Sequence, residues 1–208
     1  MMARNVLAAT AVLVLLGAPV CAWAAIIPVS NGDFQDTTTT DPPTSWAWWG
    51  ASAGFKGSHD DGGGNYVCRL TNNNAAGTGQ QTNVLSNTLS EDVVVGLDYT
   101  LTVDGRMTAI DWTYTKSNWL TIQLWDENSM LAEDSIYVLE SPTWHQLQID
   151  YTAVAGDSGA LMVCLVAKDN VYWEAVDYDN VSLTAVPEPV TLALLGLGGL
   201  GLLRRRRQ

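Results

Sequence analysis

Histidine, cysteine and basic residues are all scarce in this chain of 208 residues. Two histidines, His59 and His145, are available for acid–base chemistry or metal binding, and there are three cysteines. Neither a His-Glu-x-x-His motif nor a glycine-rich phosphate loop with its lysine occurs in the sequence. These absences remove the usual sequence signatures of zinc peptidases and nucleotide-binding proteins.

Basic residues are rarer still away from the two ends of the chain. Of the ten, one is Arg4 and four form a block at the end, so residues 25–185 keep five basic residues against 21 acidic ones, a formal charge of −16. Such a charge repels polyanions, so nucleic acid and anionic membrane surfaces are poor partners. A neutral polysaccharide, a cation or simple solubility fits this charge better.

No stretch of residues 25–185 has a convincing helical period. Apolar and polar residues instead alternate with a period of two, as in Tyr99, Leu101 and Val103. This alternation indicates strands with one buried and one solvated face. We predict strands at 29–34, 46–49, 66–71, 82–89, 99–107, 119–126, 135–139, 144–151, 161–167 and 172–183. Gly, Asn and Asp turns separate them, which predicts an all-β fold, an antiparallel β-sandwich.

The first 24 residues have the composition of a signal peptide. Arg4 is followed by an uncharged apolar run at 6–17, too short to span a bilayer, and Ala22 and Ala24 lie three residues and one residue before the expected cleavage point. We therefore expect export through the Sec machinery and removal of residues 1–24 by signal peptidase.

Export places the remaining two cysteines, Cys68 and Cys164, in an oxidising compartment. A disulfide between them would close a long loop and contribute roughly 4–5 kcal/mol. Both cysteines lie in strand-like runs, so two buried free thiols are an equally good interpretation.

The last 23 residues contain a break, an apolar run and a basic block. Two prolines stiffen the break, and the uncharged run at 190–203 covers roughly 21 Å as a helix, short of the ~30 Å hydrocarbon core. We expect a short, transient membrane helix with the basic block on the cytoplasmic side. The break is Pro187, Glu188 and Pro189, and the basic block is Arg204, Arg205, Arg206 and Arg207.

This order of parts resembles the PEP-CTERM protein-sorting signal of Gram-negative bacteria. The resemblance implies a transient inner-membrane anchor, cleavage near the Pro-Glu-Pro motif by an exosortase-type enzyme, and a final place at the cell surface or in the extracellular matrix. Such proteins commonly accompany exopolysaccharide production. We therefore expect a signal peptide at 1–24, a surface domain at 25–185 and a sorting signal at 186–208.

The ends of the surface domain carry a second resemblance. The opening Asn-Gly-Asp-Phe at 31–34 and the closing Asp-Asn-Val-Ser-Leu at 179–183 are similar to those of galactose-binding-like jelly rolls, the fold of many carbohydrate-binding modules. The resemblance implies a structural calcium ion between the first and last strands, with Asp179 as a ligand and Asp33 and Asp177 near it. Gln35 departs from the pattern, because an acidic residue commonly follows the phenylalanine. Asp179 could instead cap the strand or face water.

Tryptophan is abundant, with eight in residues 25–185. Exposed aromatic rings stack on the flat C–H faces of sugars, and polar side chains between them bond sugar hydroxyls. The best candidate face lies on the 119–126 strand and on the segment leading to it. Its residues are Trp119, Thr121, Gln123 and Trp125, with Trp112 and Tyr114 before them. The alternative is that these aromatic side chains fill a second core or cover the ends of the sandwich.

Three functions are compatible with the sequence. We favour non-catalytic association with extracellular polysaccharide or biofilm matrix over a purely structural surface protein. A glycan-active enzyme is the third hypothesis, because the pairs Asp60/Asp61 and Asp177/Asp179 could supply a glycosidase acid and base. With 21 acidic residues such pairs arise by chance, so we expect no catalysis.

Overall fold

The computed structural model describes residues 24–36, 42–49, 56–72, 81–109, 117–139, 141–169 and 174–187. Ala25–Ala185 forms one compact unit. The predicted signal peptide and sorting signal lie outside the described residues, apart from Ala24, Val186 and Pro187. Within the described ranges, no helix is long and apolar enough to cross a membrane.

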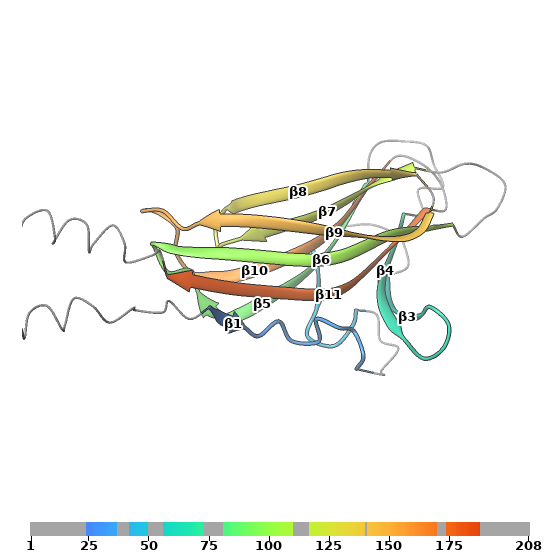
Figure 1. Ribbon diagram of the computed structural model, residues 1–208, viewed down its shortest axis with the longest axis horizontal. Helices are drawn as coiled ribbons and strands as arrows, with labels where there is room; N and C mark the ends of the chain where they lie inside the picture. The colour runs from blue at the N-terminus through green and yellow to red at the C-terminus, as the bar shows by residue number, and fades with distance from the viewer. Residues whose placement is uncertain are drawn as a thin grey trace, which may run out of the picture. The chain divides into compact units, whose positions relative to one another are not determined.

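In the described part of the chain, eleven strands form two sheets that lie one over the other (Figure 1). Sheet A has the order β3 (Lys56–Asp60), β4 (Tyr66–Asn72), β11 (Glu174–Pro187), β6 (Leu97–Ala109) and β9 (Ser141–Thr152), and β1 (Ala25–Ile27) also pairs with β11. Sheet B has the order β2 (Ala47–Trp49), β5 (Gln81–Asp92), β10 (Ala160–Asp169), β7 (Ser117–Trp125) and β8 (Met130–Leu139). Only β3–β4 and β7–β8 join neighbours within one sheet, and every other connection changes sheet. The predicted antiparallel β-sandwich is confirmed, and it has the jelly-roll topology.

The core fills the space between the two sheets. Along β6, Tyr99, Leu101 and Val103 are buried in it, and the intervening residues point to the opposite face of sheet A. Tyr178 on β11 reaches across the core to sheet B. Its hydroxyl accepts a hydrogen bond from the Thr121 N–H (2.9 Å) and donates one to the Val166 carbonyl (2.7 Å), so a buried polar group is satisfied and the two sheets are tied together.

Nine of the ten predicted strands overlap observed ones, and the strand at 29–34 is wrong. Residues 30–33 form a turn, because Asn31 and Phe34 have positive φ angles of 51° and 53°, which a strand does not allow. Phe34 still enters the core, where its ring lies 5.3 Å from that of Trp46. Strand β3 was not predicted, since its sequence Lys-Gly-Ser-His-Asp has no apolar alternation.

The opening and closing motifs meet, as the jelly-roll resemblance implies. Gly32 accepts a backbone hydrogen bond from Val181 (2.9 Å), so the turn before β2 is bonded to β11. A Cβ atom at position 32 would lie 2.6 Å from the Val181 carbonyl oxygen. Only glycine permits the two backbones to approach this closely.

The disulfide that the sequence left open does not form, because Cys68 and Cys164 are both free and buried. Cys68 belongs to the core between the sheets. Cys164 alternates along β10 with the core residues Val163 and Leu165, so its side chain points to the other face of sheet B. Two thiols on different faces cannot bring their Cβ atoms to bonding distance.

We predict that neither thiol reacts with iodoacetamide in the native protein lacking residues 1–24. Burial raises the pKa of the Cys68 thiol, and it raises that of Cys164 to about 12, so little thiolate is present at neutral pH. Mass spectrometry after labelling in denaturant without reductant should find both cysteines alkylated. Labelling that requires a reductant would mean that the two are bridged.

We predict that Gly32→Ala destabilises the protein by about 2 kcal/mol, because the added methyl group forces the turn away from Val181. Urea unfolding measures the change. Ser182→Ala, an exposed position beside Val181, is the control and should change stability by less than about 0.5 kcal/mol. Equal stability of Gly32→Ala and the parent protein would contradict the close approach.

Candidate functional site

A fully buried carboxylate lies on the outer face of sheet A. Along β11, Val176 and Tyr178 point into the core, so Asp177 between them points outward, yet its side chain has no exposed surface. A buried carboxylate requires hydrogen bonds and a nearby positive charge. The neighbouring strands supply both.

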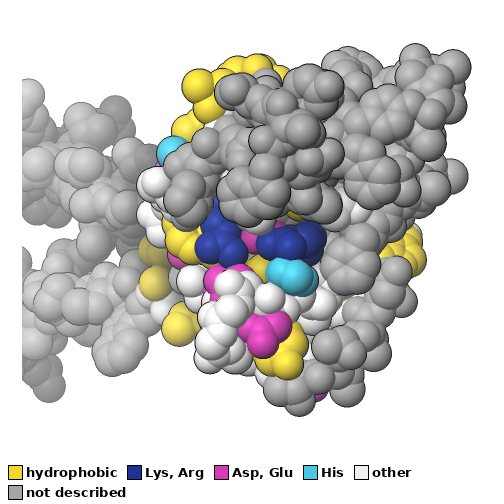
Figure 2. Space-filling model, turned by 90° about the vertical axis from the view of Figure 1, so that its right-hand side faces the viewer, with side chains coloured by type: hydrophobic (Ala, Val, Ile, Leu, Met, Phe, Trp, Pro, Cys, Tyr) yellow, Lys and Arg dark blue, Asp and Glu magenta, His cyan; other side chains and the backbone are white. Residues whose placement is uncertain are grey.

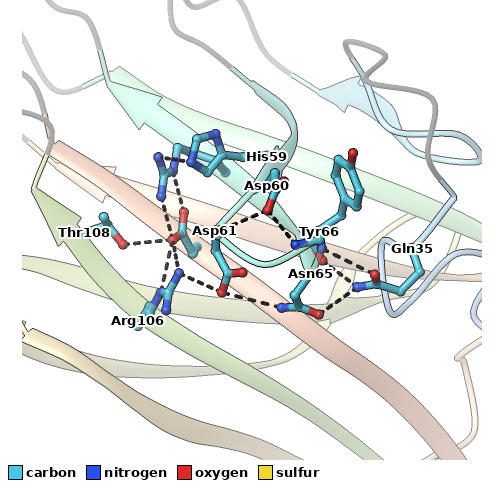
Figure 3. Close-up of polar contacts among 12 residues, drawn as sticks. Gln35, His59, Asp60, Asp61, Asn65, Tyr66, Arg106 and Thr108 are labelled. Atoms are coloured by element: carbon cyan, nitrogen blue, oxygen red, sulfur yellow. Dashed lines mark hydrogen bonds and ion pairs between the residues drawn. The ribbon is translucent and has the colours of Figure 1, made fainter.

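Two arginines and a threonine donate hydrogen bonds to Asp177; Figure 3 labels two of them, Arg106 and Thr108. Arg69, its partner on β4, donates from Nε to Oδ1 (2.6 Å) and from Nη2 to Oδ2 (2.9 Å). From β6, Arg106 donates to Oδ2 through Nε (3.1 Å) and Nη2 (3.0 Å), and the Thr108 hydroxyl donates at 2.8 Å. The carboxylate thus joins three adjacent strands of sheet A and fixes both guanidinium groups.

The Asp177 carboxyl remains ionised at neutral pH. Burial by itself raises its pKa, but the hydrogen bonds and charge of Arg69, the Thr108 hydroxyl and the charge of Arg106 outweigh burial and hold the pKa below its ordinary value. Asp177 is therefore an acceptor and a counter-charge at neutral pH, and it has no proton to donate.

His59 on β3 extends the cluster. Nη1 of Arg69 lies 2.7 Å from its Nε2 atom, and because a guanidinium only donates, Nε2 accepts and the ring proton lies on Nδ1. Burial, followed by the charge of Arg69, lowers the pKa of His59, so the ring is neutral at pH 7.

The β3–β4 hairpin places a second carboxylate beside Arg106. Asp60 accepts hydrogen bonds from the backbone of Gly62 (2.9 Å) and Gly64 (3.2 Å), which holds the turn. Asp61 on this turn lies 3.2 Å from Nη2 of Arg106. The pair Asp60/Asp61 therefore has structural partners of its own rather than the arrangement of a glycosidase acid and base.

An aromatic ring completes the cluster from β9. The guanidinium carbon of Arg106 lies 4.4 Å from the centroid of the Trp144 ring, a cation–π contact. We name the Arg69-cluster by its seven residues: His59, Asp61, Arg69, Arg106, Thr108, Trp144 and Asp177. Figure 2, which views the molecule from the right-hand side of Figure 1, shows basic, acidic and histidine side chains next to one another.

The Arg69-cluster is recessed but reachable from solvent. The side chains of Arg69 and Arg106 are 14% and 15% exposed. Within the described residues, neither Nη1 of Arg106 nor Nδ1 of His59 meets an acceptor. The two guanidinium charges are balanced by the carboxylates of Asp177 and Asp61, which leaves the cluster without net charge.

The tryptophan face predicted from sequence lies on the other sheet. Trp119, Thr121, Gln123 and Trp125 do share the outer face of β7, but Thr121 is fully buried and its hydroxyl lies 2.9 Å from that of Ser135. Gln123 accepts a hydrogen bond from the Trp125 indole (2.9 Å) and donates one to Glu133 (2.6 Å).

The polar groups between these tryptophans therefore bond largely within the protein. Trp119 is 44% exposed, and its ring lies 5.3 Å from that of Tyr137. Trp112 and Tyr114 lie outside the described residues. A sugar-binding role of this face stays a prediction.

The three predicted calcium ligands do not form one site. Asp177 is fully engaged by two guanidinium groups and does not fit a cation ligand. Asp179, two residues along the same face, has its pKa raised by burial and by the charges of Asp104 and Asp33. Among the described residues, no group of three or more acidic, histidine or cysteine side chains is placed to hold a metal ion.

The segment 50–54 reads Gly-Ala-Ser-Ala-Gly, which matches the pattern of a serine-hydrolase elbow. That elbow joins a strand to a helix. Here strand β2 ends at Trp49 and strand β3 begins at Lys56, so the element that follows the segment is a strand. The segment itself lies outside the described residues, and we assign it no chemistry.

The Arg69-cluster escaped the sequence analysis because its residues come from five strands and a turn. One signal was present in the sequence. Arg69 and Arg106 are two of only five basic residues in 25–185, and both lie inside strands, each between two residues that point into the core.

Two family models match this chain, and the boundary between their matches falls within β11. The HpiC1-like family, described as HpiC1 cyclase, matches residues 16–184. The chain belongs to the HpiC1-like family. The PEP-CTERM protein-sorting motif matches residues 185–207, which confirms the sorting signal and implies export, sorting to the cell surface and processing by an exosortase. No curated protein matches the chain.

Solved structures share the fold of this family member at low sequence identity. A Stig cyclase of Fischerella sp. TAU in complex with a pyrrolidinylidene indole has a TM-score of 0.61 and 21% identity, covering 79% of this chain and 99% of that one. An arabinose-bound GH51 α-L-arabinofuranosidase has a TM-score of 0.58 and 17% identity, covering 77% and 26%. A CBM4 structure has a TM-score of 0.52 and 13% identity, covering 76% and 99%. These likenesses establish a jelly roll of the carbohydrate-binding-module type.

We predict that Asp177→Asn lowers the free energy of unfolding by about 3 kcal/mol at pH 7, because two guanidinium groups lose their counter-charge. The lowered pKa of Asp177 also means that its stabilisation is present above pH ~4 and is lost as the pH falls further. Asp177→Asn should lack this part of the acid dependence.

Urea unfolding between pH 3 and pH 7 measures both effects. Asp150→Asn is the matched control, because Asp150 is an exposed carboxylate on the outer face of the same sheet. It should cost less than about 1 kcal/mol. A similar loss in both variants would contradict the central place of Asp177.

Proposed function

We propose that this exported surface protein binds a neutral saccharide, without chemical turnover, at the Arg69-cluster on the outer face of sheet A. The observation that carries the proposal is the rigid placement of Arg106 beside Trp144, with the guanidinium carbon 4.4 Å from the ring centroid. Saccharides are recognised by an aromatic surface for their C–H faces and by fixed polar groups for their hydroxyls. This cluster provides both.

Preorganisation supports the proposal. Asp177 holds both guanidinium groups through charged hydrogen bonds, so little side-chain entropy remains to be lost when a ligand binds. The groups left over are suited to hydroxyls: N–H donors on Arg106 and His59, and the oxygen lone pairs of the Thr108 hydroxyl. A hydroxyl both donates and accepts, so it can use each of them.

The charge balance favours a neutral ligand. The cluster carries two positive and two negative groups, and residues 25–185 carry a formal charge of −16. A uronic-acid polymer or another polyanion would be repelled by the domain as a whole. The fold type and the sorting motif, whose relatives accompany exopolysaccharide production, support the extracellular matrix as the source of the saccharide.

Cyclisation of a small molecule is the second candidate function, and the family match at residues 16–184 favours it. An acid-promoted cyclisation needs a proton donor at neutral pH. Asp177 is ionised and does not qualify, whereas Asp179, with its raised pKa, is the better donor on the same face. Asp179→Asn would therefore abolish turnover in a cyclase and leave saccharide binding largely intact.

We predict that Trp144→Ala weakens retardation in affinity gels of neutral polysaccharides by roughly 10- to 100-fold in Kd, because a stacking surface and the partner of Arg106 are both lost. Trp119→Ala is the matched control, since it removes an exposed indole from the opposite sheet. It should leave retardation unchanged.

Other outcomes of the binding assay would distinguish the alternative sites and functions. Loss of binding in Trp119→Ala alone would move the site to the tryptophan face of sheet B. No retardation by any polysaccharide would favour a purely structural role. Release of reducing ends, or conversion of an indole-containing substrate, would identify an enzyme.

A further inference from the structure

Three oxygen atoms, one from the opening turn and two from adjacent residues at the start of β4, surround one nitrogen atom, the side-chain Nε2 of Gln35 (Figure 3). They are the backbone oxygen of Asp33 (2.8 Å), the backbone oxygen of Tyr66 (2.8 Å) and Oδ1 of Asn65 (3.1 Å). An amide nitrogen carries two hydrogens, so one of them is shared. The nitrogen holds the segment after the Asn-Gly-Asp-Phe turn against the start of β4.

These oxygens belong to the opening turn and to the start of β4, next to the place where the jelly-roll resemblance puts a structural calcium ion. Asp179 on β11 accepts a hydrogen bond from the Asn180 N–H (2.7 Å), and the side chain of Asn65 acts to lower its pKa, so the closing aspartate lies near the same group. The set of backbone, amide and carboxylate oxygens is of the kind that calcium prefers.

The geometry, however, fits a hydrogen-bond donor and not the metal. Calcium binds oxygen at 2.3–2.6 Å, whereas the oxygens here lie 2.8–3.1 Å from the nitrogen, the ordinary length of an N–H···O bond. Gln35 also provides a neutral amide where a carboxylate would balance the charge of the ion. The residues present therefore do not fit calcium.

We propose that the Gln35 amide takes the structural place of a calcium ion, so that this junction holds together without metal. Its N–H groups bond the oxygens that would otherwise repel one another. The proposal does not rest on saccharide binding: the Arg69-cluster contains none of Gln35, Asp33, Asn65 and Tyr66, and the two groups meet where Nδ2 of Asn65 donates to Asp61 at 3.5 Å.

One substitution should convert the junction held by the amide into one held by calcium. Gln35→Glu replaces the donor with a carboxylate that faces three oxygens, which costs stability without metal and completes a calcium ligand set. We expect the Tm of this variant to fall in EDTA and to rise by roughly 5–10 °C when calcium exceeds its Kd about 100-fold. The Tm of the parent protein should be the same in EDTA and in calcium.

Gln146→Glu is the matched control, because it makes the same chemical change at an exposed position of sheet A. It should show no response to calcium. Gln35→Met keeps the side-chain length but has no donor, so its Tm should fall by several degrees, and calcium should not restore it.

Thermal unfolding of all four proteins in EDTA, calcium and magnesium tests the proposal. A lower Tm of the parent protein in EDTA overturns it, because a metal would then be present. Gln35→Glu without a calcium response, or Gln35→Met as stable as the parent, overturns it too. Should Gln35→Glu not fold in EDTA, its refolding yield with calcium replaces Tm, and no recovery counts against the proposal.

Discussion

The buried carboxylate of Asp177 determines the arrangement of the outer face of sheet A. It accepts hydrogen bonds from residues of β4 and β6 and thereby joins them to β11 at the centre of the sheet. Both guanidinium groups take their position from it, and the positions of His59 and Trp144 follow through contacts with those groups. A neutral residue at 177 would leave two recessed cations without this counter-charge, so the polar face and the stability of the sheet have one common origin.

A second set of polar contacts in this domain is centred on a neutral group, the side-chain amide of Gln35. At the turn that opens the jelly roll, oxygens from three residues converge, and the Gln35 amide supplies the hydrogens they require. In one place a carboxylate is buried with arginines, and in the other carbonyl oxygens are gathered around an amide. Asp177 follows the rule that a buried polar group must be paired, whereas the hydrogen bonds of Gln35 are exposed or partly buried. The Asp177 carboxylate joins β11 to β4, and the Gln35 amide joins the opening turn to the start of β4.

Fold and destination could largely be predicted from the sequence, whereas the site could not. Period-two alternation located nine strands, and the ordered parts of the tail identified the sorting motif. The strand at 29–34 was wrong because Asn31 and Phe34 take left-handed backbone angles, which no apolar pattern reveals. The tryptophan face was placed on the correct side of β7, but only neighbouring strands showed that Gln123 and Thr121 already have partners.

Fold class and sorting follow from the sequence without any tertiary contact, because both are encoded in contiguous segments whose period or order of parts acts locally. Which side chains meet depends instead on the tertiary structure. Asp177 lies 108 residues from Arg69 and 71 from Arg106, and only the sheet order β4-β11-β6 brings the three together. The same holds for the thiols, since the faces on which their strands present Cys68 and Cys164 keep the two apart. Residues far apart in the chain acquire a common chemistry only through the register of neighbouring strands.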